Sequence, residues 1–143
     1  MNVSTILKNK GFEVVTRHPE ATLNDIAQLL NENKIGSIVI VDAGDKVCGI
    51  VSERDIVSAI AMKGGAVLEE PVSTCMTQNV FTCTKEDTLE KLMTQMTKHH
   101  FRHLPVIADG KLVGLVSIGD VVKQRIAEAE MEAAAMRDYI KTG

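Results

Sequence analysis

Two short stretches of the sequence place a hydroxyl and a carboxylate at the same spacing. SERD at residues 52–55 recurs 65 residues later as SIGD at residues 117–120, and glycines, Gly49 and Gly114, precede the two stretches at equal distance. At the start of a helix, serine caps a free backbone N–H and an acidic residue occupies the first turn. Capping does not explain why both copies use aspartate, whose arm is shorter than that of glutamate. Such a carboxylate can also accept ribose hydroxyls, while the helix N-terminus favours a phosphate.

The rest of the chain is duplicated as well. Thr22-Leu23 returns as Thr88-Leu89, and the lead-in VST at residues 3–5 returns at residues 72–74. Two copies are too few for a solenoid and suggest a pseudo-symmetric pair with a cleft between its halves. We divide the chain into a first copy (1–62), a linker (63–71), a second copy (72–125) and a C-terminal helical extension (126–143).

Each copy predicts the element order β-α-β-β-α, an α+β fold with α/β-like character. Residues 14–16 predict a short strand. Apolar residues spaced i, i+3, i+4, i+7 predict a core-facing helix in each copy: Leu23, Ile26, Ala27 and Leu30, then Leu89, Leu92, Met93 and Met96. Alternating β-branched runs predict hairpins over residues 37–41 with 47–51 and 103–107 with 112–116, the latter around an Asp-Gly turn. A helix completes each copy.

Composition bounds the function. Of 143 residues, 45% are hydrophobic and 24% charged, which is typical of a soluble globule. A net charge of −3 and 3% aromatic residues argue against a nucleic-acid partner. No apolar run is long enough to span a membrane, and no signal peptide is recognised. Cys48, Cys75 and Cys83 are an odd number without CxxC spacing, so we expect free buried thiols and a cytoplasmic protein.

The duplicated motifs carry a family resemblance. The element order, the ending G-h-V-S-x-x-D (h, aliphatic) at residues 49–55 and 114–120, and the entry CMT at residues 75–77 resemble the CBS domain, named after cystathionine beta-synthase. Two such domains form a Bateman module, and the resemblance covers residues 1 to about 125. SERDIV at residues 52–57 resembles small stand-alone bacterial CBS-pair proteins in particular.

The resemblance implies a tandem, pseudo-two-fold CBS pair with a long C-terminal helix. It implies a regulatory module that binds AMP, ADP or ATP between its repeats and senses energy or redox state. NAD(H) and S-adenosylmethionine are alternative ligands, and a dimerisation or scaffold protein whose Ser-x-x-Asp turns are only helix caps is an alternative from another class. A homodimer of CBS pairs and an unidentified regulated enzyme are the implied partners. No nucleophile–base pair or paired-carboxylate site stands out, so we expect no catalytic activity.

In this family each ligand is shared between repeats, with ribose and phosphate held by one and adenine by the other. One site would combine Ser52 and Asp55 with Thr82, Phe101, Arg102, His103 and Leu104. The other would combine Ser117 and Asp120 with Thr16, Ile35, Gly36, Ser37 and Ile38. The scarcity of aromatic residues favours an aliphatic adenine slot over a stacking one.

The two predicted sites differ where a phosphate would bind. Arg102 and His103 stand where the first copy has Gly36 and Ser37, and Arg54 has a glycine as its counterpart. A guanidinium can bind phosphate bidentately. The alternative is a solvated arginine at a strand edge and a half-buried structural histidine. We expect the site with Ser52 and Asp55 to bind the phosphorylated end more tightly.

Three histidines invite a metal hypothesis. His99 and His103 are four residues apart, with His100 between them. Helical spacing is doubtful, however, because Pro105 and the adjoining apolar run indicate a transition from helix to strand. With no third ligand nearby, we expect no metal site.

The last predicted helix is longer than its counterpart in the first copy. Its apolar residues step by four and three, the a/d pattern of a coiled coil: Val122, Ile126, Ala129, Ala133, Met136 and Ile140. The seam covers less than three heptads and is rich in alanine, so an isolated coil would be marginal. The pattern fits packing on its own domain and packing on a partner chain equally well.

Overall fold

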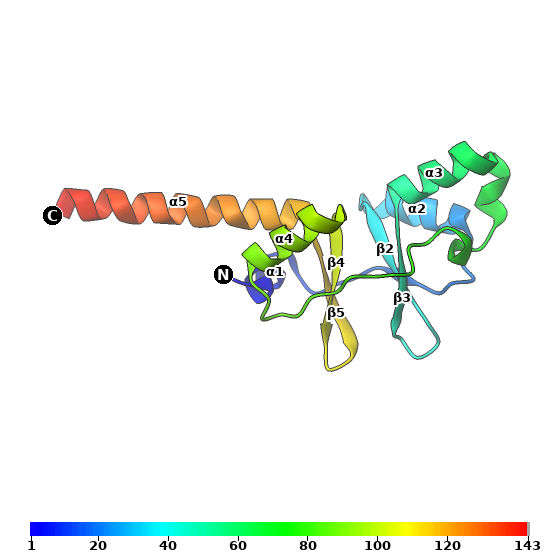
Figure 1. Cartoon of the computed structure of the whole chain (residues 1–143), viewed down its shortest axis with the longest axis horizontal. Helices are drawn as coiled ribbons and strands as arrows, with labels where there is room; N and C mark the ends of the chain where they lie inside the picture. The colour runs from blue at the N-terminus through cyan, green and yellow to red at the C-terminus, as the bar shows by residue number, and fades with distance from the viewer. Residues whose placement is uncertain (143) are drawn as a thin grey trace.

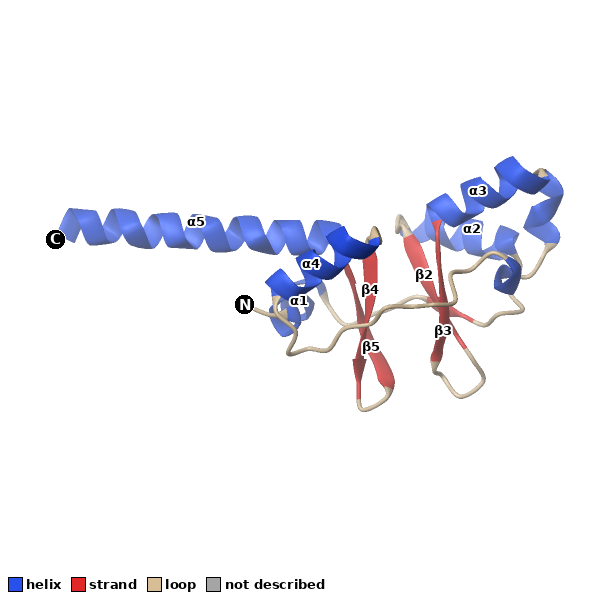
Figure 2. Cartoon of the chain, viewed as in Figure 1, coloured by secondary structure: helices blue, strands red, loops and turns tan. Residues whose placement is uncertain are grey.

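Two α+β halves lie side by side in the computed structural model, which describes residues 1–142, and a long helix leaves one of them (Figures 1 and 2). The first half consists of β1 (Thr16–Arg17), α2 (Leu23–Asn33), β2 (Ser37–Val41), β3 (Val47–Ser52) and α3 (Glu53–Lys63). The second consists of α4 (Leu89–His99), β4 (His103–Ala108), β5 (Lys111–Ser117) and α5 (Ile118–Thr142). The remaining helices are α1 (Val3–Lys10) and the short 3-10 helices η1 (Gly65–Glu69) and η2 (Val72–Thr74).

The sheets repeat the same hairpin. β2 pairs antiparallel with β3, and β4 with β5, each with one register shift near the turn. β1 adds a parallel strand beside β2, but it begins at Thr16, two residues after the start that the sequence predicted. Its counterpart in the second half is only a bridge between Cys83 and Val106. The hairpins predicted from the alternation are therefore confirmed, with strand ends that differ by one residue.

Each helix stripe packs into a separate core. Leu23, Ile26 and Leu30 of α2 are buried in the first, and Leu89, Leu92 and Met96 of α4 in the second. Met93 differs from the expectation, because 40% of its surface is exposed. Its position, i+4 from Leu89, lies at the edge of the buried stripe.

The segments that lead into the repeats cross over to the other half. α1 precedes the first repeat in sequence, yet Val3, Ile6 and Leu7 are buried in the core of the second half. Val67 of η1 and Val72 of η2 are buried in the core of the first half. The segment assigned as the linker, residues 63–71, contains the 3-10 helix η1, and each half has a core completed by a segment from outside its own repeat.

Close packing explains the two glycines that precede the strand ends. A Cβ on Gly114 would lie 2.7 Å from Cδ2 of Leu7, and a Cβ on Gly49 would meet the side chain of Met76. Leu7 and Met76 occupy matching places after the repeated lead-in VST. The glycines therefore make room for the crossing segments, and any side chain there would force those segments to shift.

The thiols are free, as expected, but Cys83 is the buried one and the other two are half-buried. Burial raises the pKa of Cys83 to about 12, which makes this thiol a poor nucleophile at neutral pH. Among residues 1–142, no helix has the length and apolarity needed to cross a membrane.

Candidate functional site

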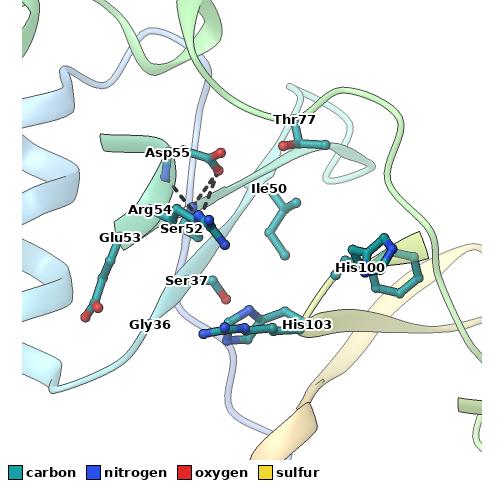
Figure 3. A pocket seen from close by; sticks show the side chains of 12 residues that line it. Gly36, Ser37, Ile50, Ser52, Glu53, Arg54, Asp55, Thr77, His100 and His103 are labelled. Atoms are coloured by element: carbon teal, nitrogen blue, oxygen red, sulfur yellow. Dashed lines mark hydrogen bonds between the residues drawn. The ribbon is translucent and has the colours of Figure 1, made fainter. Parts of the chain in front are cut away.

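A pocket of about 360 Å³ lies where the two halves meet at the ends of their hairpins (Figure 3). The first repeat supplies the β2 entry, the β3–α3 turn and one residue of β3, and the second supplies Thr77 and the α4–β4 turn. The lining residues are Gly36, Ser37, Ile50, Ser52, Glu53, Arg54, Asp55, Thr77, His100, Phe101, Arg102 and His103. The cleft expected from the duplication is therefore present and is formed by both repeats.

The first Ser-x-x-Asp turn forms one wall and caps α3. The backbone N–H of Asp55 donates to Oγ of Ser52 at 3.3 Å, and the backbone N–H of Ser52 donates to Oδ2 of Asp55 at 2.9 Å. This reciprocal pair is a capping box, and here aspartate does reach back. The N–H of Glu53 donates to the carbonyl oxygen of Gly36 at 3.1 Å, so two first-turn N–H groups of α3 are already bonded, and it is the positive end of the helix dipole that favours an anion beside this turn.

Ser37 contributes a hydroxyl deep in the same pocket. It is 2% exposed, and its Oγ has no hydrogen-bond partner among residues 1–142. A buried hydroxyl without a partner costs stability, typically about 1–3 kcal/mol. In Figure 3 its oxygen lies between the α3 start and His103. The pocket wall therefore contains a polar group whose hydrogen-bonding capacity is not used within residues 1–142.

The side chain of His103, which belongs to the second half, contacts the first half. A Cβ on Gly36 would lie 3.5 Å from its Nε2, so the imidazole packs against the backbone of that glycine. Burial is the main cause that lowers the pKa of His103, and the positive charges of Lys10 and Arg102 lower it further, against Asp120 and Glu53. The ring is therefore neutral at pH 7, able both to donate and to accept a hydrogen bond.

The pocket wall is aromatic as well as polar. Ile50 supplies an aliphatic side chain, but Phe101 also lines the pocket, and its ring centroid lies 5.0 Å from that of Phe81 and 5.8 Å from that of His99. Phe81 and His99 are themselves 4.4 Å apart. Phe101 was expected in the adenine pocket, but the stacking of its ring with Phe81 and His99 was not, because the scarcity of aromatic residues favoured an aliphatic slot.

The second Ser-x-x-Asp turn has the same backbone geometry but a different neighbour. The N–H of Ser117 donates to Oδ2 of Asp120 at 2.9 Å, and the N–H of Asp120 donates to Oγ of Ser117 at 3.1 Å. Lys10, at the end of α1, places its Nζ 2.6 Å from the same Oδ2 and 2.8 Å from the carbonyl oxygen of Leu115. The second turn therefore already binds a positive charge, the ammonium group of Lys10.

The electrostatics of Asp120 follow from this contact. Burial acts to raise the pKa of Asp120, but the hydrogen bonds from Lys10 and from the N–H of Ser117, together with the charge of Lys10, outweigh it and lower the pKa. The carboxylate stays ionised and paired at neutral pH. A ligand that uses Asp120 would have to compete with an amine already in place.

The structure gathers only part of the predicted residues in the pocket. Ser52, Arg54, Asp55, Phe101, Arg102 and His103 line it, together with Gly36 and Ser37, which were assigned to the second site. Leu104 and Ile38 are fully buried in the cores, because alternate strand residues face opposite sides. The remaining predicted residues lie outside the pocket lining: Thr16, Ile35, Thr82, Ser117 and Asp120.

Four lining residues were not predicted: Ile50, Glu53, Thr77 and His100. Thr77 pairs with Ile50 through two backbone hydrogen bonds of 2.9 and 3.0 Å, which draw the entry of the second repeat onto β3. The CMT motif marked this segment, but its position beside β3 depends on the crossing of the lead-ins. His100 is the C-cap of α4 and has a left-handed backbone conformation.

The histidines do not combine into a ligand set. His99 lies in α4, His100 is its C-cap and His103 is in β4. Within the described part of the chain, no group of three His, Cys, Asp or Glu residues is arranged to hold a metal ion.

A family model for the CBS domain matches residues 12–62 and 72–126, so both repeats are covered. The chain belongs to the CBS domain family. The tandem pair inferred from the duplicated motif is thereby confirmed. The match begins after α1, the helix that packs on the second repeat.

Solved structures of CBS-domain proteins share this fold. The CBS-domain protein ATU1752 from Agrobacterium tumefaciens is 45% identical with a TM-score of 0.84, over 87% of this chain and 92% of that one. The CBS protein PAE2072 from Pyrobaculum aerophilum, solved with AMP, is 28% identical with a TM-score of 0.75, over 84% and 89%. The CBS pair of protein MJ0100, solved with 5-methylthioadenosine and S-adenosyl-L-methionine, is 25% identical with a TM-score of 0.80, over 90% and 98%.

Proposed function

We propose that this CBS pair is a regulatory module that binds one adenosine nucleotide in the pocket lined by Ser52 and Asp55. The observation that carries the proposal is the composition of that pocket. It joins the N-terminus of α3, two arginines and the buried unpartnered hydroxyl of Ser37, with contributions from both repeats. The adenosine ligands of PAE2072 and MJ0100 support the choice of adenosine.

Asp55 is the proposed ribose ligand. Both bonds from Ser52, from its N–H and its Oγ, go to Oδ2 of Asp55 at 2.9 and 3.2 Å. Oδ1 can therefore accept ribose hydroxyls without dismantling the helix cap. Helix capping and nucleotide binding are compatible in this geometry, so the two explanations of the motif do not compete.

Arg54 and Arg102 are the proposed phosphate ligands. They enter the pocket from different repeats, one from the first turn of α3 and one from the turn before β4. Arg102 is exposed, so its side chain can reorient towards a bound anion. A phosphate held between them would tie the two repeats together. We infer that this closure is the signal passed to a regulated enzyme.

The second Ser-x-x-Asp turn is proposed to be silent while Lys10 holds Asp120. Lys10 bonds to Oδ2 of Asp120 at 2.6 Å and to the carbonyl oxygen of Leu115, so the carboxylate that would have to accept a ribose is already paired with an amine, whose charge and side chain lie beside it. The first turn has no such partner, because its carboxylate bonds only to its own serine within residues 1–142. The module is therefore proposed to take one ligand at low concentration.

The identity of the group attached to adenosine is left to a direct screen. AMP, ADP and ATP fit the arginine pair, NAD(H) would extend further along the cleft, and S-adenosylmethionine would bring a positive charge towards two guanidinium groups. We therefore place the nucleotides first. The free thiols fit a reducing compartment, and we infer a cytoplasmic location.

Thermal unfolding with each compound tests the proposal. A ligand at a hundred times its dissociation constant adds about 2.7 kcal/mol, or roughly 5–10 °C at this chain length. A shift of that size for one adenosine nucleotide supports the module. No shift with any of them, in protein shown by mass spectrometry to carry no bound nucleotide, would leave the turns as helix caps of a scaffold.

A further inference from the structure

Glu53 lines the proposed nucleotide pocket, but neither the ribose site nor the phosphate site uses its side chain. Its backbone N–H donates to the carbonyl oxygen of Gly36 at 3.1 Å, which ties the first residue of α3 to the entry of β2. The matching position of the second turn holds the apolar Ile118. A carboxylate thus lies in a pocket that is proposed to bind an anion, and only the first turn has it.

The carboxylate of Glu53 is not neutralised by a partner. Among residues 1–142, neither Glu53 nor the two arginines of the pocket, Arg54 and Arg102, forms an ion pair. With Asp55, the lining therefore contains two basic and two acidic side chains besides its histidines. The arginines attract the phosphate of a ligand, and Glu53 repels it.

Figure 3 shows which end of the pocket Glu53 faces. Asp55, the proposed ribose ligand, extends from the α3 start in one direction, and Glu53 extends in the other, on the side of Gly36. Burial is the main cause that lowers the pKa of His103, and the negative charge of Glu53 acts in the opposite direction, so this charge is felt at the imidazole. Arg102, a proposed phosphate ligand, is the neighbour of His103 in sequence. Glu53 therefore lies towards the phosphate end of the pocket.

The repulsion grows with the number of phosphates on the ligand. A Coulomb energy is proportional to each of the two charges, and every phosphate added to AMP brings further negative charge. The pocket volume of about 360 Å³ also lies near the lower end of the range of about 300–1,000 Å³ that is usual for ligand sites, so little room remains for a longer chain of phosphates.

We propose that Glu53 determines the phosphate number of the ligand, because its carboxylate repels the added phosphates of ADP and ATP more strongly than the single phosphate of AMP. The inference rests on the proposed function and assigns the pocket to a nucleoside monophosphate. Glu53 is then a specificity-determining residue, separate from the groups that hold the ribose and the phosphate.

Titration calorimetry of the full chain with adenosine, AMP, ADP and ATP tests the assignment. Wild type is expected to bind AMP more tightly than ATP. Glu53→Gln removes the charge and keeps the size of the side chain, so it should tighten binding of AMP by about 3-fold and of ATP by about 10-fold, with ADP between them. Adenosine carries no phosphate and should bind as it does to wild type.

Two variants and the salt concentration provide the controls. Glu32→Gln removes the same charge from an exposed position of α2 outside the pocket lining, and it should change none of the four affinities. Glu53→Asp keeps the charge and should keep the preference for AMP. Because Glu53 is exposed, the difference between wild type and Glu53→Gln should shrink as sodium chloride is raised from about 0.05 to 0.5 M.

The ratio of ATP affinity to AMP affinity decides the outcome. A ratio that is the same in wild type and Glu53→Gln, or a wild type that binds ATP more tightly than AMP, would overturn the inference. So would a loss of ATP affinity in Glu53→Gln that appears only with Mg²⁺, since the carboxylate would then bind the metal of a triphosphate complex. If wild type binds none of the four compounds, the proposed nucleotide site fails, and this inference fails with it.

Discussion

The Nζ of Lys10 lies 2.6 Å from Oδ2 of Asp120, whereas Asp55, in the matching turn, bonds to Ser52 of its own turn. Two copies of one motif therefore differ in what reaches their carboxylates. The cause is the crossing of α1 to the second half, which brings Lys10 beside β5. The two motifs have the same residues at the same spacing, but the packing of α1 places a lysine beside only the second carboxylate.

Removing the amine should open the second turn. Lys10→Met keeps the length and apolar stem of the side chain but frees Asp120, so nucleotide stoichiometry by titration calorimetry is expected to rise from one towards two per chain. Lys8→Met, on the exposed side of the same helix, is the matched control and should leave it at one. Two equivalent sites already present in wild type would contradict the silent second turn.

The pKa of Asp120 reports the same contact without any ligand. In the folded chain the pKa of Asp120 is lowered from 3.8. As the pH falls below about 4, the unfolded chain therefore takes up this proton before the folded chain does. The free energy of unfolding decreases until the pH has passed the pKa of Asp120 in the folded chain. In Lys10→Met, the pKa of Asp120 measured by NMR should rise, and the protein should lose less stability at acid pH. An unchanged Asp120 pKa would mean that Lys10 does not hold the carboxylate in solution.

Buried His103 predicts a second pH effect. Its pKa is lowered from 6.5, so stability is full above that value and falls as pH drops towards the folded pKa, because the unfolded state takes up the proton first. His103→Gln should flatten this limb of the stability–pH curve measured by urea unfolding. A curve of unchanged slope between pH 6.5 and 5 would assign the effect to other groups.

Arg102 should discriminate phosphate from nucleoside. Arg102→Ala is expected to weaken binding of the nucleotide by about 10–100-fold, the usual value of a hydrogen bond to a charged group, and binding of adenosine by less than about 3-fold. Lys111→Ala removes an exposed charge of the same half, away from the pocket, and should change neither. Equal losses for nucleotide and adenosine would remove Arg102 from the phosphate site.

Gly114 tests how tightly α1 is seated. A Cβ there would lie 2.7 Å from Leu7, so Gly114→Ala should destabilise the fold by about 1–3 kcal/mol, or roughly 3–9 °C in Tm. Gly65→Ala is the control, because a Cβ on Gly65 meets nothing within 4 Å. In a Leu7→Ala background, Gly114→Ala should lower the Tm by less, because the side chain that the new Cβ would meet is no longer there. A Tm equal to that of wild type would show that α1 moves aside freely.

The repeated hairpins were predictable because alternation and turn residues are local signals. The β2 bounds, Ser37–Val41, were predicted without error, and the stripe of Leu23, Ile26 and Leu30 is buried as its spacing required. The duplication then placed the Ser-x-x-Asp turns at equivalent helix starts. Local periodicity and internal repetition were thus sufficient for the fold class and for the position of the first turn.

The crossing of the lead-ins was not predictable from such signals. Nothing local to Lys10 indicates a partner 110 residues away, and Thr77 enters the pocket only because its segment pairs with β3 of the other repeat. Strand residues such as Leu104 were predicted in the site by family position, but the side that each faces depends on the register, which was known only once β4 and β5 were paired.

Titration calorimetry of Asp55→Asn beside Asp120→Asn tests the central claim most directly. Both substitutions keep the size of the side chain and remove one charge from equivalent helix starts. We predict that Asp55→Asn weakens binding of the adenosine nucleotide by about 30-fold or more, while Asp120→Asn changes it by less than about 3-fold. Equal losses in the two variants, or full binding by a well-folded Asp55→Asn, would contradict a single nucleotide site at the first turn.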